Sequence, residues 1–167
     1  TCLYAGLVTD TGRFQYSNTG PQTLREGAEM LAAGADALSI ATRVYESQPL
    51  GMLSLIGRVL SRIRLENGGA VAWSWIDEYD LDDTCVKMEE TEGVIELVRT
   101  IRDVDAVFMA KVRRGEVRVS LRAKDAADVG SVARELGGGG HRAAAGFTAQ
   151  GGLEQVVEQV LPLLPAR

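Results

Sequence analysis

Residues 137–147 read Gly-Gly-Gly-Gly-His-Arg-Ala-Ala-Ala-Gly-Phe, and a run of four glycines is unfavourable for packing. Each glycine costs roughly 0.5–1 kcal/mol against alanine inside a helix or strand, because it has more backbone freedom to lose. In return, glycine permits positive φ angles, and consecutive N–H groups can turn toward one point and form an anion-binding nest. The only histidine of the chain, His141, follows directly, and then Arg142. Amide donors, an imidazole and a guanidinium so close together predict a site for phosphate or a nucleotide.

A second interpretation of the same stretch is a flexible loop after a helix, with Gly137 as the helix C-cap. The common nucleotide-binding motifs do not match. The sequence has no Gly-Lys-Ser/Thr and no GxGxxG that opens a helix. Spacing alone leaves both interpretations open.

The composition restricts the ligand class. The chain has 167 residues, enough for one domain or two small ones, and its 46% hydrophobic and 25% charged residues are ordinary for a soluble globular protein. The net charge of −5 excludes a broad electrostatic footprint for duplex nucleic acid. We therefore expect a short nucleic-acid ligand, held in a pocket that is locally positive.

The cysteines and the N-terminal residues indicate the expected cellular location. Cys2 and Cys85 fit no CxxC spacing, which favours reduced thiols and a cytoplasmic location. An apolar run of the roughly 18 residues needed for a membrane span is absent, so no membrane association is expected. The first residues include neither a starting Met nor a basic segment, which predicts a piece of a longer protein rather than a signal peptide.

The first third of the chain holds one candidate metal ligand. Residues 3–8 form a short apolar run that predicts a buried strand, and an extended pattern resumes at residues 14–16. Asp10 would lie at the tip of that strand, where α/β proteins place their chemistry. An Asx-turn or a helix N-cap is the alternative role for Asp10. Thr23 and Asp36 are the predicted N-caps of two following helices.

The middle of the chain predicts a long helix and then a strand. Pro49 opens the helix, which Asn67-Gly68-Gly69 would end, and residues 70–76 alternate as a strand does. Residues 77–83 carry five acids but lack the EF-hand pattern, so they predict an exposed connection or a helix N-terminus. A further helix is predicted over residues 92–102.

The last third predicts a hairpin, a short helix and a closing helix. Strands over residues 105–113 and 116–123 would join at Arg114-Gly115. Arg118, Ser120 and Arg122 share one face of the second strand, and Arg122 is placed to reach a phosphate beside the glycines. Asp125 or Asp128 would cap a helix over residues 129–136, a strand would follow at residues 145–148, and a helix at residues 153–164 would close the chain.

Three segments in this order resemble the DHH phosphoesterase superfamily: Leu7-Val8-Thr9-Asp10-Thr11-Gly12-Arg13-Phe14, Val119-Ser120-Leu121-Arg122, and residues 137–147. The subgroup is that of bacterial oligoribonucleases that also remove the 3′-phosphate of phosphoadenosine phosphate, and the resemblance covers nearly the whole chain. It implies an α/β fold: the end of a parallel α/β domain, a linker helix, then a smaller mixed-sheet α/β domain. The implied boundaries are residues 1–47 for the DHH catalytic domain, 48–68 for the linker, and 69–167 for the DHH-associated substrate domain.

The resemblance also implies roles for individual residues. Two Mn²⁺ ions serve the family, and Asp10 matches its last metal-ligand aspartate in the catalytic site. The family's Asp-His-His motif and its early His and paired-Asp segment are absent here, so Asp10 and one histidine cannot supply the metal site. Ala123 stands where the subgroup often carries serine. The implied substrate-binding residues are Ser120, Arg122, Gly138, Gly139, Gly140, His141 and Arg142.

The expected function is therefore that of part of a hydrolase. Its ligands would be short RNA, dinucleotides or a nucleotide bisphosphate, the parent protein would be a homodimer through the DHH domain, and the isolated chain would not hydrolyse them. Two alternatives differ in class. One is a non-catalytic nucleotide- or RNA-binding module, and the other is an interaction or dimer-forming domain in which the glycines are a linker.

Overall fold

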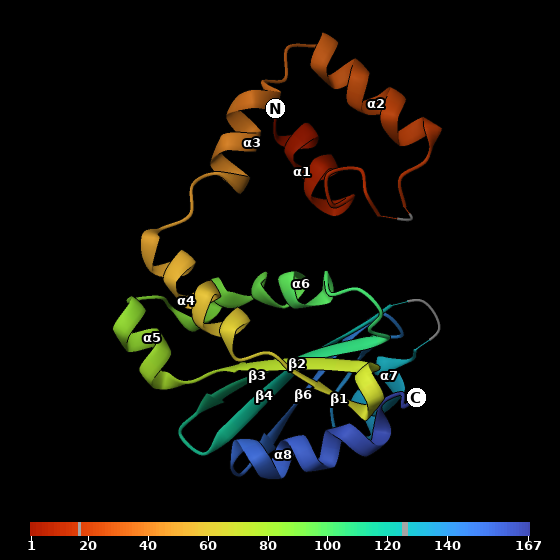
Figure 1. Ribbon diagram of the computed structural model, residues 1–167. Helices are drawn as coiled ribbons and strands as arrows, with labels where there is room; N and C mark the ends of the chain where they lie inside the picture. The colour runs from red at the N-terminus through yellow and green to blue at the C-terminus, as the bar shows by residue number, and fades with distance from the viewer. Residues whose placement is uncertain (17, 125–126) are drawn as a thin grey trace. The chain divides into compact units, whose positions relative to one another are not determined.

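The computed structural model describes residues 1–16, 18–124 and 127–167 (Figure 1). The chain divides into two compact units, Thr1–Pro49 and Leu50–Arg167. Which parts of the chain correspond to a catalytic domain, a linker and a substrate domain stays a prediction.

The regular elements described in the first unit are helices: α1 (Cys2–Asp10), α2 (Pro21–Ala32) and α3 (Ala37–Tyr45). The predicted strand at residues 3–8 is wrong, and so is the extended pattern at residues 14–16, which form turns. A strand needs a neighbour for its backbone hydrogen bonds, whereas a helix satisfies them internally. No strand is described elsewhere in this unit, so the short apolar run forms a helix.

Two predicted caps in this unit had different outcomes. Asp36 caps α3 as predicted, because its carboxylate accepts a hydrogen bond from the Ser39 N–H at 2.9 Å. Thr23 is not an N-cap. Helix α2 begins two residues earlier, at Pro21, and the Thr23 hydroxyl accepts a hydrogen bond from the Gly20 N–H at 3.2 Å. Proline is well suited to the first helical position, where its missing N–H costs nothing.

The second unit is built on a six-stranded sheet in the order β1-β2-β3-β4-β6-β5 (Figure 1). Strands β2 and β3 are parallel, and the other neighbouring pairs are antiparallel. The predicted mixed-sheet α/β fold is confirmed. The strands are β1 (Arg64–Glu66), β2 (Val71–Ile76), β3 (Ala106–Arg113), β4 (Glu116–Ala123), β5 (Gly139–His141) and β6 (Ala144–Gln150).

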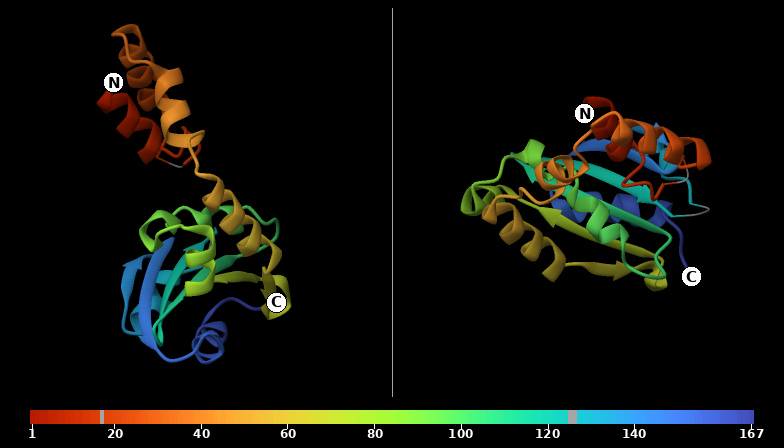
Figure 2. Two further views of the ribbon diagram at one scale, coloured as in Figure 1. Left: turned by 90° about the vertical axis from the view of Figure 1, so that its left-hand side faces the viewer. Right: turned by 90° about the horizontal axis from the view of Figure 1, so that it is seen from above.

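Helices cover both faces of this sheet, as Figures 1 and 2 show. Side chains of α4, α5 and α6 form one core with residues such as Ile76 and Val107. Side chains of α7 and α8 form the other core with residues such as Phe108 and Leu121. The helices are α4 (Leu50–Ser61), α5 (Glu78–Thr84), α6 (Val94–Arg99), α7 (Val129–Glu135) and α8 (Leu153–Val160), with 3-10 turns η1 (Asn67–Gly69), η2 (Met88–Thr91) and η3 (Leu161–Leu163).

The predicted hairpin of β3 and β4 is confirmed. Arg114 and Gly115 form its two-residue turn with φ angles of 50° and 78°. Positive φ at both turn residues matches the twist of the flanking strands. Burial alternates along β4, so Val117, Val119 and Leu121 enter the core while the intervening side chains face the other way.

Some other elements begin or end at residues that differ from the predicted ones. The long helix ends at Ser61 rather than at Asn67, because residues 64–66 form the edge strand β1. The acidic stretch is a helix N-terminus, where the Asp77 carboxylate accepts from the Asp80 N–H at 2.9 Å. Asp128 caps α7 through the Ser131 N–H at 3.0 Å. The alternative cap, Asp125, lies outside the described residues.

Candidate functional site: an open pocket over strands β4, β6 and β5

An open pocket of about 560 Å³ lies over β4, β6 and β5. Helix α6 packs on β2, β3 and β4, and among the described residues it does not extend over the sheet beyond β4. The volume falls within the range of ordinary small-ligand pockets.

Strand alternation and register build the floor of the pocket. Arg118, Ser120 and Arg122 lie opposite Thr148, Gly146 and Ala144 of β6 in the antiparallel ladder. Gly139 of β5 pairs with Gly146 in turn. Alternate residues of a strand share a face, so these positions lie on one side of the sheet. The row Ser120, Gly146, Gly139 leaves a hollow between the two arginines because its side chains are small or absent.

The glycine run does not form a loop with all its amides free, because its first two N–H groups bond to the end of α7. The Gly137 N–H donates to the Arg134 carbonyl at 3.1 Å, and the Gly138 N–H donates to the Ala133 carbonyl at 2.7 Å. Both amides therefore cap α7, as the second interpretation of this stretch has it for Gly137. The Gly138 N–H is thus engaged within the chain, and the role of Gly138 in substrate binding stays a prediction. Residues 139–141 continue as the edge strand β5, and an edge strand directs alternate amides away from the sheet.

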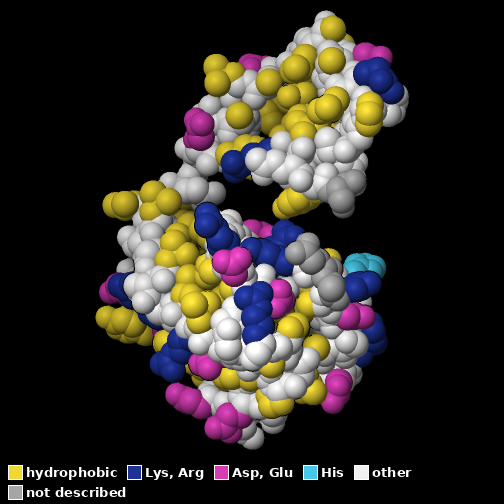
Figure 3. All heavy atoms as spheres, turned by 45° about the vertical axis from the view of Figure 1, so that its right-hand side comes forward, with side chains coloured by type: hydrophobic (Ala, Val, Ile, Leu, Met, Phe, Trp, Pro, Cys, Tyr) yellow, Lys and Arg dark blue, Asp and Glu magenta, His cyan; other side chains and the backbone are white. Residues whose placement is uncertain are grey.

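Sheet register brings two of the predicted binding residues, Arg122 and His141, into one row. His141 pairs with Ala144, and Ala144 pairs with Arg122. With neighbouring strands about 4.8 Å apart, the two backbones are separated by about 10 Å. His141 is exposed, and the histidine, cyan in Figure 3, lies at the surface.

Carboxylates from the segment that precedes and enters α6 neutralise the pocket cations. The Arg122 Nε lies 2.7 Å from Glu96 Oε1, and the nearest Arg118 nitrogen lies 3.8 Å from Glu92 Oε1. Glu92 also accepts from the Nζ of Lys111 at 2.9 Å. The hydrogen bond from Lys111 lowers the pKa of Glu92, and it outweighs the partial burial that raises it. Glu92 is therefore ionised at neutral pH.

The predicted binding residues are only partly gathered in this pocket. Ser120, Arg122, Gly138 and Gly139 line it, whereas Gly140, His141 and Arg142 belong to the strand and turn beside it. The Arg142 carbonyl accepts from the Val129 N–H at 3.0 Å, which ties this turn to α7.

Four charged groups at the site were not among the predicted site residues: Arg118, Lys111, Glu92 and Glu96. Arg118 has the strand parity of Ser120 and Arg122, which was enough to include it. Lys111 interrupts the apolar run of residues 106–112 in β3, which is a usable signal of a buried partner. Glu92 gave no local signal, because its place depends on how the segment before α6 crosses the sheet.

Asp10 lies in the other unit. It is the last residue of α1 rather than the tip of a strand, it is exposed, and its backbone carbonyl accepts from Asn18 Nδ2 at 3.0 Å. Within residues 1–16, 18–124 and 127–167, no group of three or more His, Cys, Asp or Glu side chains could hold a metal ion. The donors in the described part of this chain therefore do not fit a pair of Mn²⁺ ions.

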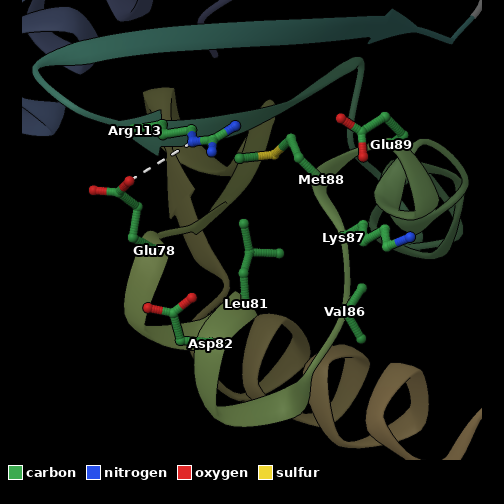
Figure 4. Close-up of a pocket in the computed structure, with 8 residues that line it drawn as sticks. All are labelled: Glu78, Leu81, Asp82, Val86, Lys87, Met88, Glu89 and Arg113. Carbon is green, nitrogen blue, oxygen red and sulfur yellow. Dashed lines mark ion pairs between the residues drawn. The ribbon is translucent and has the colours of Figure 1, made fainter.

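A second pocket, of about 220 Å³, lies between α5, the segment after it and the end of β3 (Figure 4). Leu81 and Met88 point into it, and Glu78 forms an ion pair with Arg113 at 3.7 Å. Three carboxylates line this pocket beside two cationic side chains. It is smaller and more acidic than the pocket over β4, β6 and β5, so it suits an anionic ligand less well.

Cys2 and Cys85 are free and exposed. None of the helices in the described ranges combines the length and apolarity needed to cross a lipid bilayer.

Comparison with known proteins identifies the family. Residues 68–164 match the DHHA1 domain. The bifunctional oligoribonuclease and PAP phosphatase NrnA of Thermus thermophilus is 34% identical over 163 residues, covering 96% of this chain and 48% of the relative. An A-adding tRNA nucleotidyltransferase of Geobacter sulfurreducens is 28% identical over 166 residues, covering 96% of this chain and 18% of the relative.

Among solved structures, an exopolyphosphatase-related protein from Bacteroides fragilis superposes with a TM-score of 0.88 and 26% identity, covering 95% of this chain and 47% of that one. The chain spans about half the length of the NrnA relatives that it matches. Since the domain match covers more than half of the residues, the chain belongs to the DHHA1 domain family, in the NrnA branch of the DHH proteins.

Proposed function

We propose that this chain is the substrate-binding part of a phosphoesterase that hydrolyses short oligoribonucleotides and dinucleotides, and also 3′-phosphoadenosine 5′-phosphate. One observation carries the proposal: Arg118 and Arg122 flank a hollow floor of Ser120, Gly146 and Gly139. Guanidinium groups suit phosphate oxygens, because their planar N–H donors match two oxygens at once. The names of the NrnA relatives agree with this ligand class.

The residues of this chain would bind and orient the ligand. Arg122 and His141, in one row of the sheet, would hold a phosphate, and the Ser120 hydroxyl would donate to a phosphate or sugar oxygen. The hollow above Gly146 gives a sugar or base room to lie flat on the sheet. A pocket of about 560 Å³ favours mononucleotides and dinucleotides over long polymers.

Catalysis is assigned to a larger protein. Asp10 is proposed as one ligand of a Mn²⁺ pair whose other ligands lie outside this chain. Such a pair would activate water for attack on phosphorus. The proposal includes a cytoplasmic location, a homodimer through the DHH domain, and the division of the chain into residues 1–47, 48–68 and 69–167.

Replacing Arg122 with alanine is expected to weaken binding of 3′-phosphoadenosine 5′-phosphate by about tenfold or more, because a charge-assisted hydrogen bond to phosphate is lost. Isothermal titration calorimetry on the 167-residue chain would measure this effect. The matched control is Arg113→Ala, on the neighbouring strand outside the pocket, which should bind as the parent does. Equal affinity of Arg122→Ala and the parent would exclude the pocket assignment.

The second candidate function is a nucleotide- or RNA-binding module without chemistry. Two observations favour it. All residues that line the pocket belong to Leu50–Arg167, whereas the described residues include no cluster of side chains that could bind a metal ion. The similarity to a tRNA nucleotidyltransferase, a protein of another activity, also agrees with it.

Asp10→Asn separates the two functions in the full-length protein that carries this sequence. With Mn²⁺ and a dinucleotide, the phosphoesterase proposal predicts that the variant loses hydrolysis by at least about a hundredfold and still binds. The 167-residue chain alone should bind without hydrolysis. A full-length parent that binds but never hydrolyses would establish the module, and turnover by the chain alone would contradict the assignment of catalysis to a larger protein.

A further inference from the structure

Glu92 is the acidic side chain among the described residues that line the pocket over β4, β6 and β5. It lies where η2 ends, just before α6, and faces the sheet at the end of the pocket that Arg118 occupies. A carboxylate here is unexpected in a site for phosphate, because it repels the ligand that the arginines attract. Its position therefore calls for a functional explanation.

Lys111 fixes this carboxylate in place. The Lys111 side chain is 2% exposed, and its Nζ donates to Glu92 Oε1 at 2.9 Å. In the ladder Lys111 lies directly opposite Arg118, so both cations approach Glu92 from the sheet. A buried ammonium needs its partner, because an unpaired buried charge is costly. Glu92 is consequently held as an anion and cannot move away without leaving Lys111 unpaired.

The geometry leaves one oxygen of Glu92 for a ligand. Both contacts, from Lys111 and from Arg118, go to Oε1. Among the described residues no hydrogen bond to Oε2 is present, and the side chain is 53% exposed. An ionised carboxylate oxygen only accepts hydrogen bonds. The pocket thus presents donors, the two arginines and Ser120, beside one fixed acceptor.

We infer that Glu92 is a specificity-determining residue, whose carboxylate makes the pocket prefer a nucleotide to an inorganic polyphosphate. In a nucleotide, ribose hydroxyls or base amines adjoin the phosphate and can donate to Oε2. A polyphosphate chain carries negative charge along its whole length and offers acceptors only. This inference rests on the proposed function of the pocket. It adds which kind of phosphate ligand the pocket prefers, a nucleotide rather than inorganic polyphosphate.

Glu92→Gln tests the inference. Lys111 would hold the amide oxygen, so the NH₂ group would face the pocket and replace an acceptor by a donor. We expect affinity for 3′-phosphoadenosine 5′-phosphate to fall about tenfold and affinity for inorganic tripolyphosphate to rise several-fold, so the preference for the nucleotide collapses. Calorimetric titration of the 167-residue chain with each probe measures both constants.

Two further variants keep the test interpretable. Glu89→Gln makes the same chemical change on an exposed residue of the same 3-10 turn, outside this pocket, and should preserve the parent's preference. Glu92→Asp keeps the charge beside Lys111 but shortens the side chain. It should weaken nucleotide binding without improving tripolyphosphate binding, and it replaces Glu92→Gln if thermal unfolding shows that the latter is not folded.

The outcomes distinguish this inference from the proposed function. A parent that prefers the nucleotide, with Glu92→Gln showing the same preference, overturns the role of Glu92 and leaves the pocket assignment intact. A folded parent that binds neither probe overturns both.

Discussion

Gly138→Ala is expected to lower the free energy of unfolding of the unit Leu50–Arg167 by about 3 kcal/mol, the upper part of the range for overpacking. A Cβ at this position would lie 2.2 Å from the Gly146 carbonyl oxygen and 2.4 Å from the Phe147 Cβ. Backbone atoms of β6 cannot yield cheaply, because β6 is paired on both sides. Gly138 cannot retreat either, since its N–H donates to Ala133 at the end of α7.

Gly139→Ala is the matched control one residue away. A Cβ there meets nothing within 4 Å, and the backbone φ is not in the left-handed region. Its free energy of unfolding should therefore change by less than about 1 kcal/mol. Gly139 lines the pocket, so the added methyl should weaken nucleotide binding while the fold is kept.

Urea unfolding followed by tryptophan fluorescence measures both variants. The two tryptophans, Trp73 and Trp75, lie on β2, so their emission reports on this unit. Equal destabilisation by the two substitutions would contradict the packing explanation, and so would a stable Gly138→Ala. The two neighbouring glycines would thus separate a structural requirement from a ligand-binding one.

The glycine run illustrates what the sequence can predict about this site. The four glycines indicated positive φ angles in this stretch, and Gly137 and Gly140 adopt them, with φ of 79° and 137°. Their conformation followed from tertiary contacts instead, because Gly138 and Gly140 pack against the backbone of β6. Whether an amide caps a helix or faces a ligand is decided by the neighbouring elements and not by the glycines themselves.

Local patterns were sufficient where they were long or had specific turn chemistry. The hairpin at Arg114-Gly115 and the Asp36 cap depend on contacts between residues close in sequence. The apolar run at residues 3–8 is too short to separate a helix from a strand by periodicity. Glu92 and Lys111 are 19 residues apart, and only the folded sheet brings them together.

Asp80→Ala is expected to destabilise the same unit by about 3 kcal/mol at neutral pH, since removing one partner of a buried ion pair leaves the other charges uncompensated. The Asp80 side chain is 1% exposed and receives hydrogen bonds from Arg62 at 2.7 and 2.8 Å. It also accepts from the Asp77 N–H at 3.1 Å and so completes the cap of α5. Urea unfolding by fluorescence would report the loss, because Arg62 lies over the Trp75 ring.

Asp83→Ala is the control for this substitution. Its side chain is 47% exposed and pairs with Arg58 at the surface, so its loss should cost less than about 1 kcal/mol. A comparable loss from both substitutions would show that burial is not the cause.

The pH dependence of stability gives an independent test of the same carboxylate. Burial raises the pKa of Asp80, but the hydrogen bonds and charges of Arg62 and Arg58, with the Asp77 N–H, outweigh it and hold the pKa below 3.8. A carboxyl group with a depressed folded-state pKa contributes stability above its unfolded pKa, and loses it as the pH falls through the folded value. The difference in free energy of unfolding between the parent and Asp80→Asn should therefore be constant near neutral pH and shrink below about pH 4. A difference that persists unchanged to about pH 2 would mean that Asp80 acts through packing rather than through its charge.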